Sequence, residues 1–164
     1  MKNYFYTRES PRDEIEWVRA KEVPRDLPRP IVLITGVFDL LHVGHMRAIY
    51  AAKKKAGTLV VAVNSDEWVR KYKDPRRPIM SFIERITALK YMPVDVIVEI
   101  NTEKELRDLT ISLKPDLKVM GSDHLDVVHK YPWMKKMLVR VGGMHTSIII
   151  NRVLEKYGYK QTPV

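Results

Sequence analysis

Several absences narrow what this 164-residue sequence can encode. It contains no cysteine, which excludes a disulfide framework and a zinc site built on thiolates. No apolar stretch approaches the roughly 20 residues that a membrane-spanning helix needs, so we expect no membrane partner. The opening residues, MKNYFYTRES, lack the apolar core of a secretion signal, and we therefore expect a cytoplasmic protein.

The sequence also lacks an Arg-rich tract, although its formal net charge is +9. Such a charge suits an anionic partner, either nucleic acid or small phosphorylated substrates. Net charge can also serve solubility alone, so the charge does not choose between these possibilities. The 29 basic residues are scattered among 20 acidic ones and form no interleaved aromatic platform, and we expect no nucleic-acid partner.

What is present is a globular composition, with 45% hydrophobic and 30% charged residues in a length that suits one domain. From residue 31 onward, apolar β-branched runs alternate with helix-forming segments, which predicts a parallel sheet with helices on both faces. The strands are expected at 31–35, 59–63, 94–100, 117–120 and 137–141. The helices are expected at 45–55, 66–71, 82–91, 103–113 and 147–157, with an irregular loop over 122–132.

The first 30 residues read as an addition to this alternating pattern. Ser10, Pro11 and Asp13 have the order of an N-cap, a first-turn proline and a first-turn acid, which predicts a short helix to about Lys21. The prolines that follow cannot continue a helix and predict an extended lead-in. We expect an N-terminal helix and lead-in over 1–30, the main domain over 31–158 and a tail over 159–164.

The segment GVFDLLHVGH at 36–45 joins the first buried strand of this domain to a helix. A strand, a turn containing glycine and a helix N-terminus form a phosphate-binding construction, because backbone N–H groups and the helix dipole point at an anion. Gly36 allows a tight exit from the strand, and Gly44 lets the backbone approach the phosphates. His42 and His45 lie on one side of the helix start and can donate to phosphate oxygens, best when protonated. They lack a third partner for zinc, and the competing interpretation is a pair of capping or structural histidines.

The pattern formed by these residues resembles the Gly-x-Phe-Asp-x-x-His-x-Gly-His signature of the cytidylyltransferase-like nucleotidyltransferases. The likeness extends over about residues 31–155. The stretch AVNSD at 62–66 and the pattern Lys73-x-x-x-Arg77-Pro78 followed by Glu84-Arg85 resemble heptose-phosphate enzymes. These residues align with the heptose-phosphate enzymes without gaps.

Two later segments extend the resemblance. Residues 115–123 resemble the Pro-Asp…Lys-Gly-x-Asp segment of the family. Residues 140–149 resemble its second signature, Arg-x-x-Gly-x-Ser-Thr-Thr-x-Ile, in the form found in glycerol-3-phosphate cytidylyltransferases because of Arg140. The sequence departs from the family at His145, where serine is usual, and at Val37, where threonine or cysteine is common.

The resemblance implies a Rossmann-like, doubly wound parallel sheet of five strands in the order 3-2-1-4-5, with a nucleotide across the carboxyl ends of strands one and four. It assigns catalytic roles to His42, His45, Lys73, Thr146 and Ser147. It assigns nucleotide binding to Thr35, Gly36, Val37, Phe38, Asp39, Gly44, Asn64, Arg77, Arg85, Gly121, Asp123 and Arg140.

Within that assignment, Lys73 would neutralise the phosphates of donor and acceptor, and Arg85 would help to hold the site. The competing interpretation of the basic segment 70–77 is a solvated charge run. Thr146 and Ser147 would cap the last helix and form a second anion site there. Mg²⁺ is implied by a nucleoside triphosphate, with Asp39 and Asp123 as weak candidates to touch it and no metal site formed by the protein itself.

The implied reaction is attack of an acceptor phosphate on the α-phosphorus of a nucleoside triphosphate, with release of pyrophosphate. Donors placed at the phosphoryl oxygens act by electrostatic preorganisation. The segment from 62 to 85 favours ATP and a sugar or heptose 1-phosphate, whereas the Arg140 block favours CTP and glycerol 3-phosphate. The sequence is also compatible with a cofactor-forming adenylyltransferase, a catalytically silent nucleotide sensor and a nucleic-acid-binding module. The resemblance further implies a homodimer.

Overall fold

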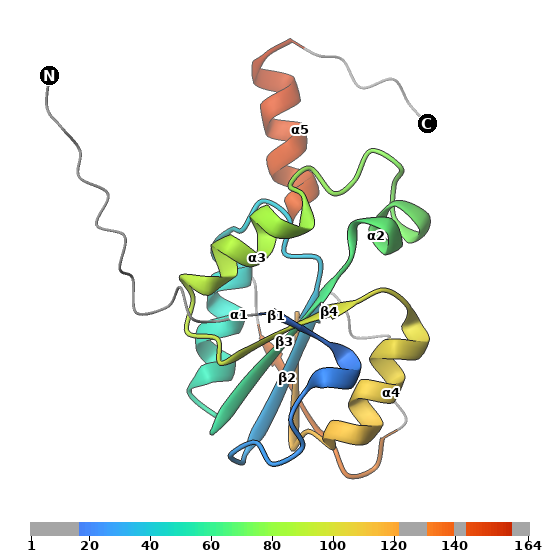
Figure 1. Cartoon of the computed structure of the whole chain (residues 1–164). Helices are drawn as coiled ribbons and strands as arrows, with labels where there is room; N and C mark the ends of the chain where they lie inside the picture. Colours follow the sequence, from blue (N-terminus) through green and yellow to red (C-terminus); the bar gives the residue numbers. More distant parts are fainter. Residues whose placement is uncertain (1–16, 122–130, 140–143, 159–164) are drawn as a thin grey trace, which may run out of the picture.

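The computed structural model describes residues 17–121, 131–139 and 144–158, which form an α/β structure around one parallel sheet (Figure 1). The sheet has the order β1-β4-β3-β2-β5-β6. Its strands are β1 Trp17–Arg19, β2 Ile31–Gly36, β3 Thr58–Asn64, β4 Val96–Ile100, β5 Leu117–Gly121 and β6 Lys135–Val139. The helices are α1 Val43–Lys53, α2 Asp66–Tyr72, α3 Phe82–Lys90, α4 Glu103–Leu113 and α5 Thr146–Lys156.

The two central strands are apolar along almost their whole length because both of their faces are covered. Residues 31–33 of β2 and 59–63 of β3 are fully buried. Alternate residues of these strands pack into two separate clusters, one with α1 and α3 and the other with α4. This arrangement is the doubly wound sheet that the continuous Val/Ile runs predict.

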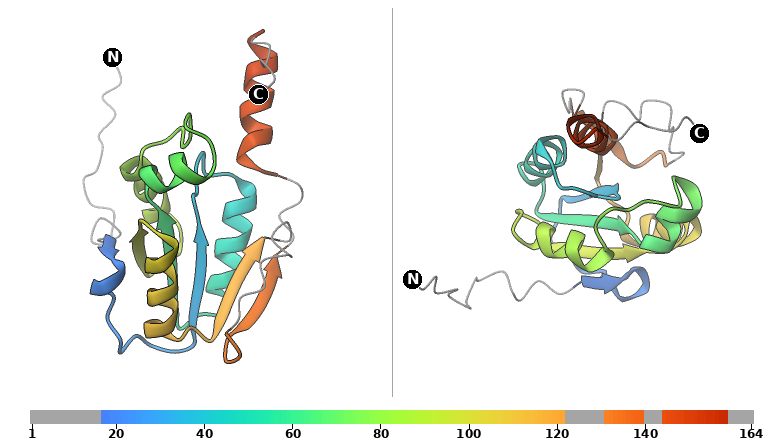
Figure 2. Two further views of the ribbon diagram at one scale, coloured as in Figure 1. Left: turned by 90° about the vertical axis from the view of Figure 1, so that its right-hand side faces the viewer. Right: turned by 90° about the horizontal axis from the view of Figure 1, so that it is seen from above.

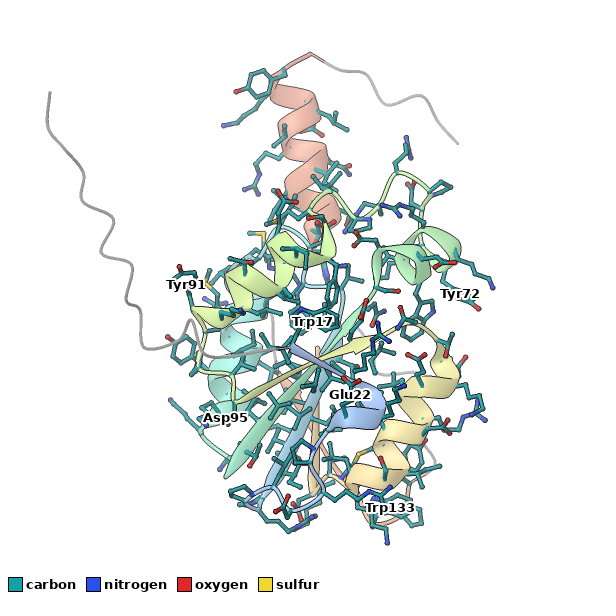
Figure 3. The ribbon with its side chains drawn as sticks, viewed as in Figure 1. Trp17, Glu22, Tyr72, Tyr91, Asp95 and Trp133 are labelled. Atoms are coloured by element: carbon teal, nitrogen blue, oxygen red, sulfur yellow. The ribbon has the colours of Figure 1, made fainter. Side chains whose placement is uncertain are left out.

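The predicted order 3-2-1-4-5 is present as β4-β3-β2-β5-β6, but the prediction of a sheet with only five strands was wrong. The sixth strand, β1, pairs with β4 in the register Trp17↔Ile97. Trp17, labelled in Figure 3, packs edge-on against Phe82 on one face of the sheet, and Val18 packs into the cluster on the other face.

The predicted helix to about Lys21 is therefore wrong over residues 17–19, where a strand lies, and a 3-10 helix over Ala20–Glu22 follows it. The side chains of Trp17 and Val18 alternate between the two faces, which is the periodicity of a strand. The start of the predicted helix, at 10–16, lies outside the described residues, as do 122–130 of the predicted loop.

The order in which successive strands are added to the sheet reverses at β2, which has β3 on one side and β5 on the other. Ligands of open α/β sheets bind at such a switch point, beyond the carboxyl ends of the strands. The segment that follows β2 at this point is 37–42, and α5 projects beyond the same end of the sheet (Figure 2).

Candidate active site

The loop from β2 to α1 has an unusual backbone. Phe38 and Leu40 have φ angles of +57° and +47°, in the left-handed region that side-chain-bearing residues rarely adopt. The Phe38 ring is only 3% exposed within the core cluster under α1, and its centroid lies 5.2 Å from that of His45. Burial of this ring offsets the backbone strain and holds the loop in one conformation.

His42 is the N-cap residue of α1. Its Nδ1 accepts a hydrogen bond from the Gly44 N–H at 3.1 Å. A neutral imidazole has one protonated nitrogen, so this bond leaves the proton on Nε2, where it can be donated to a ligand. Burial, reinforced by His145, holds the pKa of His42 below its ordinary value.

His45 stacks on His42, with ring centroids 3.9 Å apart and an interplanar angle of 25°. Burial lowers the pKa of His45 to about 4, with His42 and Lys73 acting in the same direction and Asp39 opposing them. The Nδ1 atom of His45 is buried and, among the described residues, has no hydrogen-bond partner. A buried polar atom without a partner is costly, and a bound ligand would relieve that cost.

The sequence predicts that these histidines act best as protonated donors. In the protein without a bound anion the lowered pKa values make both rings neutral near pH 7. A phosphate chain beside them would raise these pKa values, because a negative charge favours the imidazolium form.

Gly44 is closely packed by its neighbours. A Cβ at this position would lie 2.9 Å from Cε1 of His42 and 3.0 Å from the Met144 carbonyl oxygen. Glycine is therefore required here for the packing of the His42 ring and of the chain that leads into α5, so the predicted approach to phosphates is not needed to explain it.

Asp39 is fully buried and joins three segments. Its carboxylate accepts hydrogen bonds from the Arg77 Nε at 2.9 Å, the Ile79 N–H at 3.0 Å and the Met80 N–H at 2.9 Å. Its backbone carbonyl accepts a hydrogen bond from the Thr146 Oγ1 at 3.0 Å. Asp39 thus holds the 77–80 segment and the start of α5 against the first loop. Its carboxylate is committed to protein donors and does not suit a magnesium ion.

Arg85 is also fully buried. The sequence predicts that it binds the nucleotide, but its burial and its protein partners make it a support of the site. Its guanidinium donates to the carbonyl oxygens of Val37, Asn64 and Met80 and to Oδ1 of Asp66 at 2.6 Å. The backbone of Val37 and Asn64, predicted to bind nucleotide, serves this network.

Asp66 is a site-supporting residue that sequence reasoning missed. Its Oδ2 accepts a hydrogen bond from the Phe82 N–H at 3.1 Å while its Oδ1 binds Arg85, so it ties the start of α2 to the start of α3. The feature of the sequence that could have indicated this role is the position of Asp66 at the end of the AVNSD stretch.

The basic segment divides into residues with different surroundings. Lys73 follows α2, and its positive charge contributes to the lowered pKa of His45. Arg77 is largely buried and is bound to Asp39, so its guanidinium supports the loop. Arg76 is exposed and pairs with Asp74, as the solvated-run interpretation predicts.

The start of α5 forms the other half of the site. The predicted capping role of Thr146 and Ser147 is wrong, because His145 occupies the N-cap position and Thr146 is the first helical residue. Ser147 is exposed, and Thr146 binds the first loop. Gly36 ends β2 and Gly121 ends β5, so each of these strands runs one residue further than predicted. Asp123 and Arg140 lie outside the described residues.

The groups at this site are of the kind that suits an anion. The N-termini of α1 and α5 meet at the first loop, where Thr146 binds Asp39 and where His42 and His45 stack at the start of α1. Within the described residues, no group of three or more histidine, cysteine or acidic side chains could hold a metal ion, and no helix is long and apolar enough to cross a membrane. The arrangement supplies helix dipoles, N–H donors and positive charge to a phosphate chain.

Comparison with known proteins identifies the family. A family model described as cytidylyltransferase-like matches residues 33–157. The chain belongs to the cytidylyltransferase-like family. This confirms the resemblance predicted from the first and second signatures and the assignment of the chain to the nucleotidyltransferase enzymes.

Curated relatives are longer than this chain. The bifunctional protein HldE of Syntrophotalea carbinolica is 35% identical over 160 residues, which cover 92% of this chain and 31% of the relative. HldE of Geobacter metallireducens is 36% identical over 138 residues, covering 79% of this chain and 28% of the relative. The chain thus spans about a third of the length of the curated relatives it matches.

A solved structure shares the fold. The lipopolysaccharide core biosynthesis protein from Thermoplasma volcanium GSS1 is 26% identical to this chain, with a TM-score of 0.50. The match covers 78% of this chain and 88% of that protein.

Proposed function

We propose that this chain transfers a nucleoside monophosphate from a nucleoside triphosphate to a phosphorylated small molecule and releases pyrophosphate, with ATP and a sugar or heptose 1-phosphate as its substrates. The observation that carries the proposal is the stacked pair of His42 and His45 at the N-terminus of α1, with Nε2 of His42 available as a donor. The similarity to a lipopolysaccharide core biosynthesis protein supports a sugar phosphate as the acceptor.

The proposed role of the histidines and of Lys73 is to stabilise the negative charge of the reacting phosphates. In the transfer, the acceptor phosphate oxygen attacks the α-phosphorus while the bond to the pyrophosphate breaks, and negative charge spreads over the phosphoryl oxygens. His42 and His45 donate hydrogen bonds to those oxygens, and Lys73 neutralises the adjoining phosphates. Because Asp39, Arg77 and Arg85 already hold the loop, these donors need little rearrangement when charge develops.

Mg²⁺ would accompany the triphosphate. The described residues contain no ligand cluster for it, and the carboxylate of Asp39 is occupied by protein donors. Magnesium commonly keeps several waters and takes phosphate oxygens as its other ligands, so it would be bound through the nucleotide.

The decisive experiment measures pyrophosphate release with Mg²⁺ while ATP and CTP are each combined with sugar 1-phosphates, glycerol 3-phosphate and phosphocholine. We expect release with ATP and a heptose 1-phosphate. Release with CTP and glycerol 3-phosphate would instead establish a glycerol-3-phosphate-type cytidylyltransferase. Nucleotide binding without release would indicate a sensor or an untested acceptor, and neither binding nor release would contradict the transferase proposal.

The proposed role of Lys73 has its own test. We expect Lys73→Ala to raise the KM for the nucleotide by about tenfold, the scale of one charge-assisted hydrogen bond, while the protein stays folded. Arg76→Ala is the matched control, because Arg76 is an exposed cation of the same segment that is paired with Asp74. Equal KM values in the two variants would contradict the role of Lys73 and would support the interpretation of the whole segment as a solvated charge run.

A further inference from the structure

A pocket lies at the carboxyl ends of β1 and β4, beside the start of α4. Its volume is about 460 Å³, within the range of pockets that hold small molecules. The 3-10 helix Ala20–Glu22 forms part of it and lies against α4 (Figure 1). The pocket is lined by Arg19, Ala20, Lys21, Glu99, Asn101 and Glu105. The first three of these residues precede residue 33, so the matched family domain accounts for only part of the pocket.

The two walls of this pocket carry opposite charges. The N-terminal wall has two exposed cations, Arg19 and Lys21. The acidic wall consists of Glu99, Asn101 and Glu105, from the end of β4 and the first turn of α4. Arg19 is the register partner of Glu99 in the sheet, yet within the described part of the chain these two side chains form no ion pair. Both charges are therefore available to a ligand.

The acidic wall presents oxygen atoms that can accept hydrogen bonds. Oε2 of Glu105 accepts from the Asn101 N–H at 2.8 Å and from the Asn101 Nδ2 at 3.3 Å, which orders both side chains. The other side-chain oxygen of each residue can accept from a ligand. Burial raises the pKa of Glu99 above its ordinary value, although Arg19 opposes this shift. A partly desolvated carboxylate of this kind is stabilised when a ligand donates hydrogen bonds to it.

The N-terminal wall lies far from the first loop across the sheet. Arg19 is in β1, and β4 and β3 lie between β1 and β2. Neighbouring strands are about 4.8 Å apart, so β1 lies roughly 14 Å from the strand that leads into the candidate active site. Among the described residues, the lining of the pocket shares none with that site. A phosphate on the N-terminal wall is therefore not the attacking group of the proposed transfer.

We propose that this pocket is a second ligand site, which binds a sugar phosphate without reacting with it. The phosphate contacts the cations of the N-terminal wall, since ammonium and guanidinium groups form charge-assisted hydrogen bonds with phosphate. The hydroxyl groups donate to the oxygens of the acidic wall. A sugar phosphate fits this pocket better than an α-amino acid, because several hydroxyl groups match acceptors at three positions, whereas an ammonium group is a single centre. The inference goes beyond the proposed function, because binding here needs neither nucleotide nor turnover.

The test follows the amide NMR signals of Ala20 and Asn101 in the full chain, without nucleotide, during titration with glucose 1-phosphate and with inorganic phosphate. Lys21→Ala removes a cation of the N-terminal wall, so we expect it to weaken the binding of both probes about tenfold. Glu99→Gln removes a charged acceptor at nearly constant shape, so glucose 1-phosphate should bind about fivefold more weakly. Inorganic phosphate has no sugar hydroxyl groups and should bind to Glu99→Gln at least as tightly as to the wild type.

Matched controls change the same charges outside the pocket. Lys104→Ala and Glu103→Gln alter residues of α4 that do not line it, and both should bind the probes as the wild type does. Absence of shifts at both amides with millimolar glucose 1-phosphate would overturn the proposal. Equal weakening of both probes in Glu99→Gln would also overturn it, because that pattern indicates damage to the pocket.

A further probe separates the two classes of ligand. Shifts caused by free serine and not by glucose 1-phosphate would replace the sugar phosphate with an amino acid and overturn the assignment. The failure of this inference and the failure of the proposed function are distinguishable. Pyrophosphate release tests the transfer, whereas the amide signals of Ala20 and Asn101 report only on this pocket.

Discussion

The two helix N-termini that form the site are supported in different ways. Helix α1 buries Gly44, Ala48, Ile49 and Ala52 against the sheet, and the ring of His42 caps it. Helix α5 has no buried residue, receives no side-chain capping bond and projects beyond the sheet (Figure 2). The comparison teaches that one half of the site is fixed by the hydrophobic core, whereas the other depends on a few polar contacts with the first loop.

The largest expected effect is a loss of stability when the buried guanidinium of Arg85 is removed. Arg85→Met would leave the Asp66 carboxylate and buried carbonyl oxygens without their donor, and we expect a loss of roughly 3 kcal/mol of unfolding free energy. Urea denaturation of the wild-type and variant proteins measures this change in the free energy of unfolding. Arg76→Met at the exposed surface should change stability by less than about 0.5 kcal/mol, and equal losses would contradict the network.

The next effect concerns the chemistry carried by α1. His42→Ala and His45→Ala should each lower turnover by at least about a hundredfold, the scale of losing one preorganised donor. Circular dichroism should show a retained fold. Near-normal turnover in either folded variant would contradict the proposal that both histidines are needed for the transfer.

Gly44→Ala tests the contact between the two halves. The added methyl group would press on the His42 ring and on the Met144 carbonyl, so we expect turnover to fall about tenfold, because small displacements of catalytic groups are costly. Gly36→Ala, with its nearest contact at 3.3 Å on the Phe38 ring, should have a milder effect. Unchanged turnover in Gly44→Ala would show that the close contact between Gly44 and Met144 is not needed for activity.

The pH dependence of stability reports on the buried ring of α1. His45 has a pKa of about 4 in the folded protein against 6.5 ordinarily, so between these values the unfolded chain binds a proton that the folded chain does not. The free energy of unfolding should therefore fall as the pH is lowered from 7 toward 4. His45→Gln should reduce this slope, and an identical slope in both proteins would contradict the lowered pKa.

The smallest effect concerns the motion of α5. Its amides should exchange with solvent faster than those of α1, because few buried contacts resist local opening. Hydrogen exchange with and without ATP measures this, and bound nucleotide should slow exchange near Thr146. Equal protection of the two helices in the free protein would contradict the difference between them.

Much of the fold followed from local patterns. Helix α4 has the predicted bounds, Glu103–Leu113. The buried strands follow from uninterrupted Val/Ile runs, and the strand order followed from the family resemblance. The N-terminal strand β1 was missed because three residues carry little periodicity, and its existence depends on pairing with β4.

The sequence by itself determined which residues could bind phosphate and where the chain alternates between strand and helix, because those properties depend on residue type and short spacing. Only the tertiary structure decided that Arg85 and Asp39 serve as buried supports and that burial lowers the pKa values of His42 and His45. These outcomes depend on burial and on contacts between segments far apart in the chain, such as Thr146 with Asp39. Desolvation and long-range hydrogen bonds have no local signature, so they become visible only when the chain is folded.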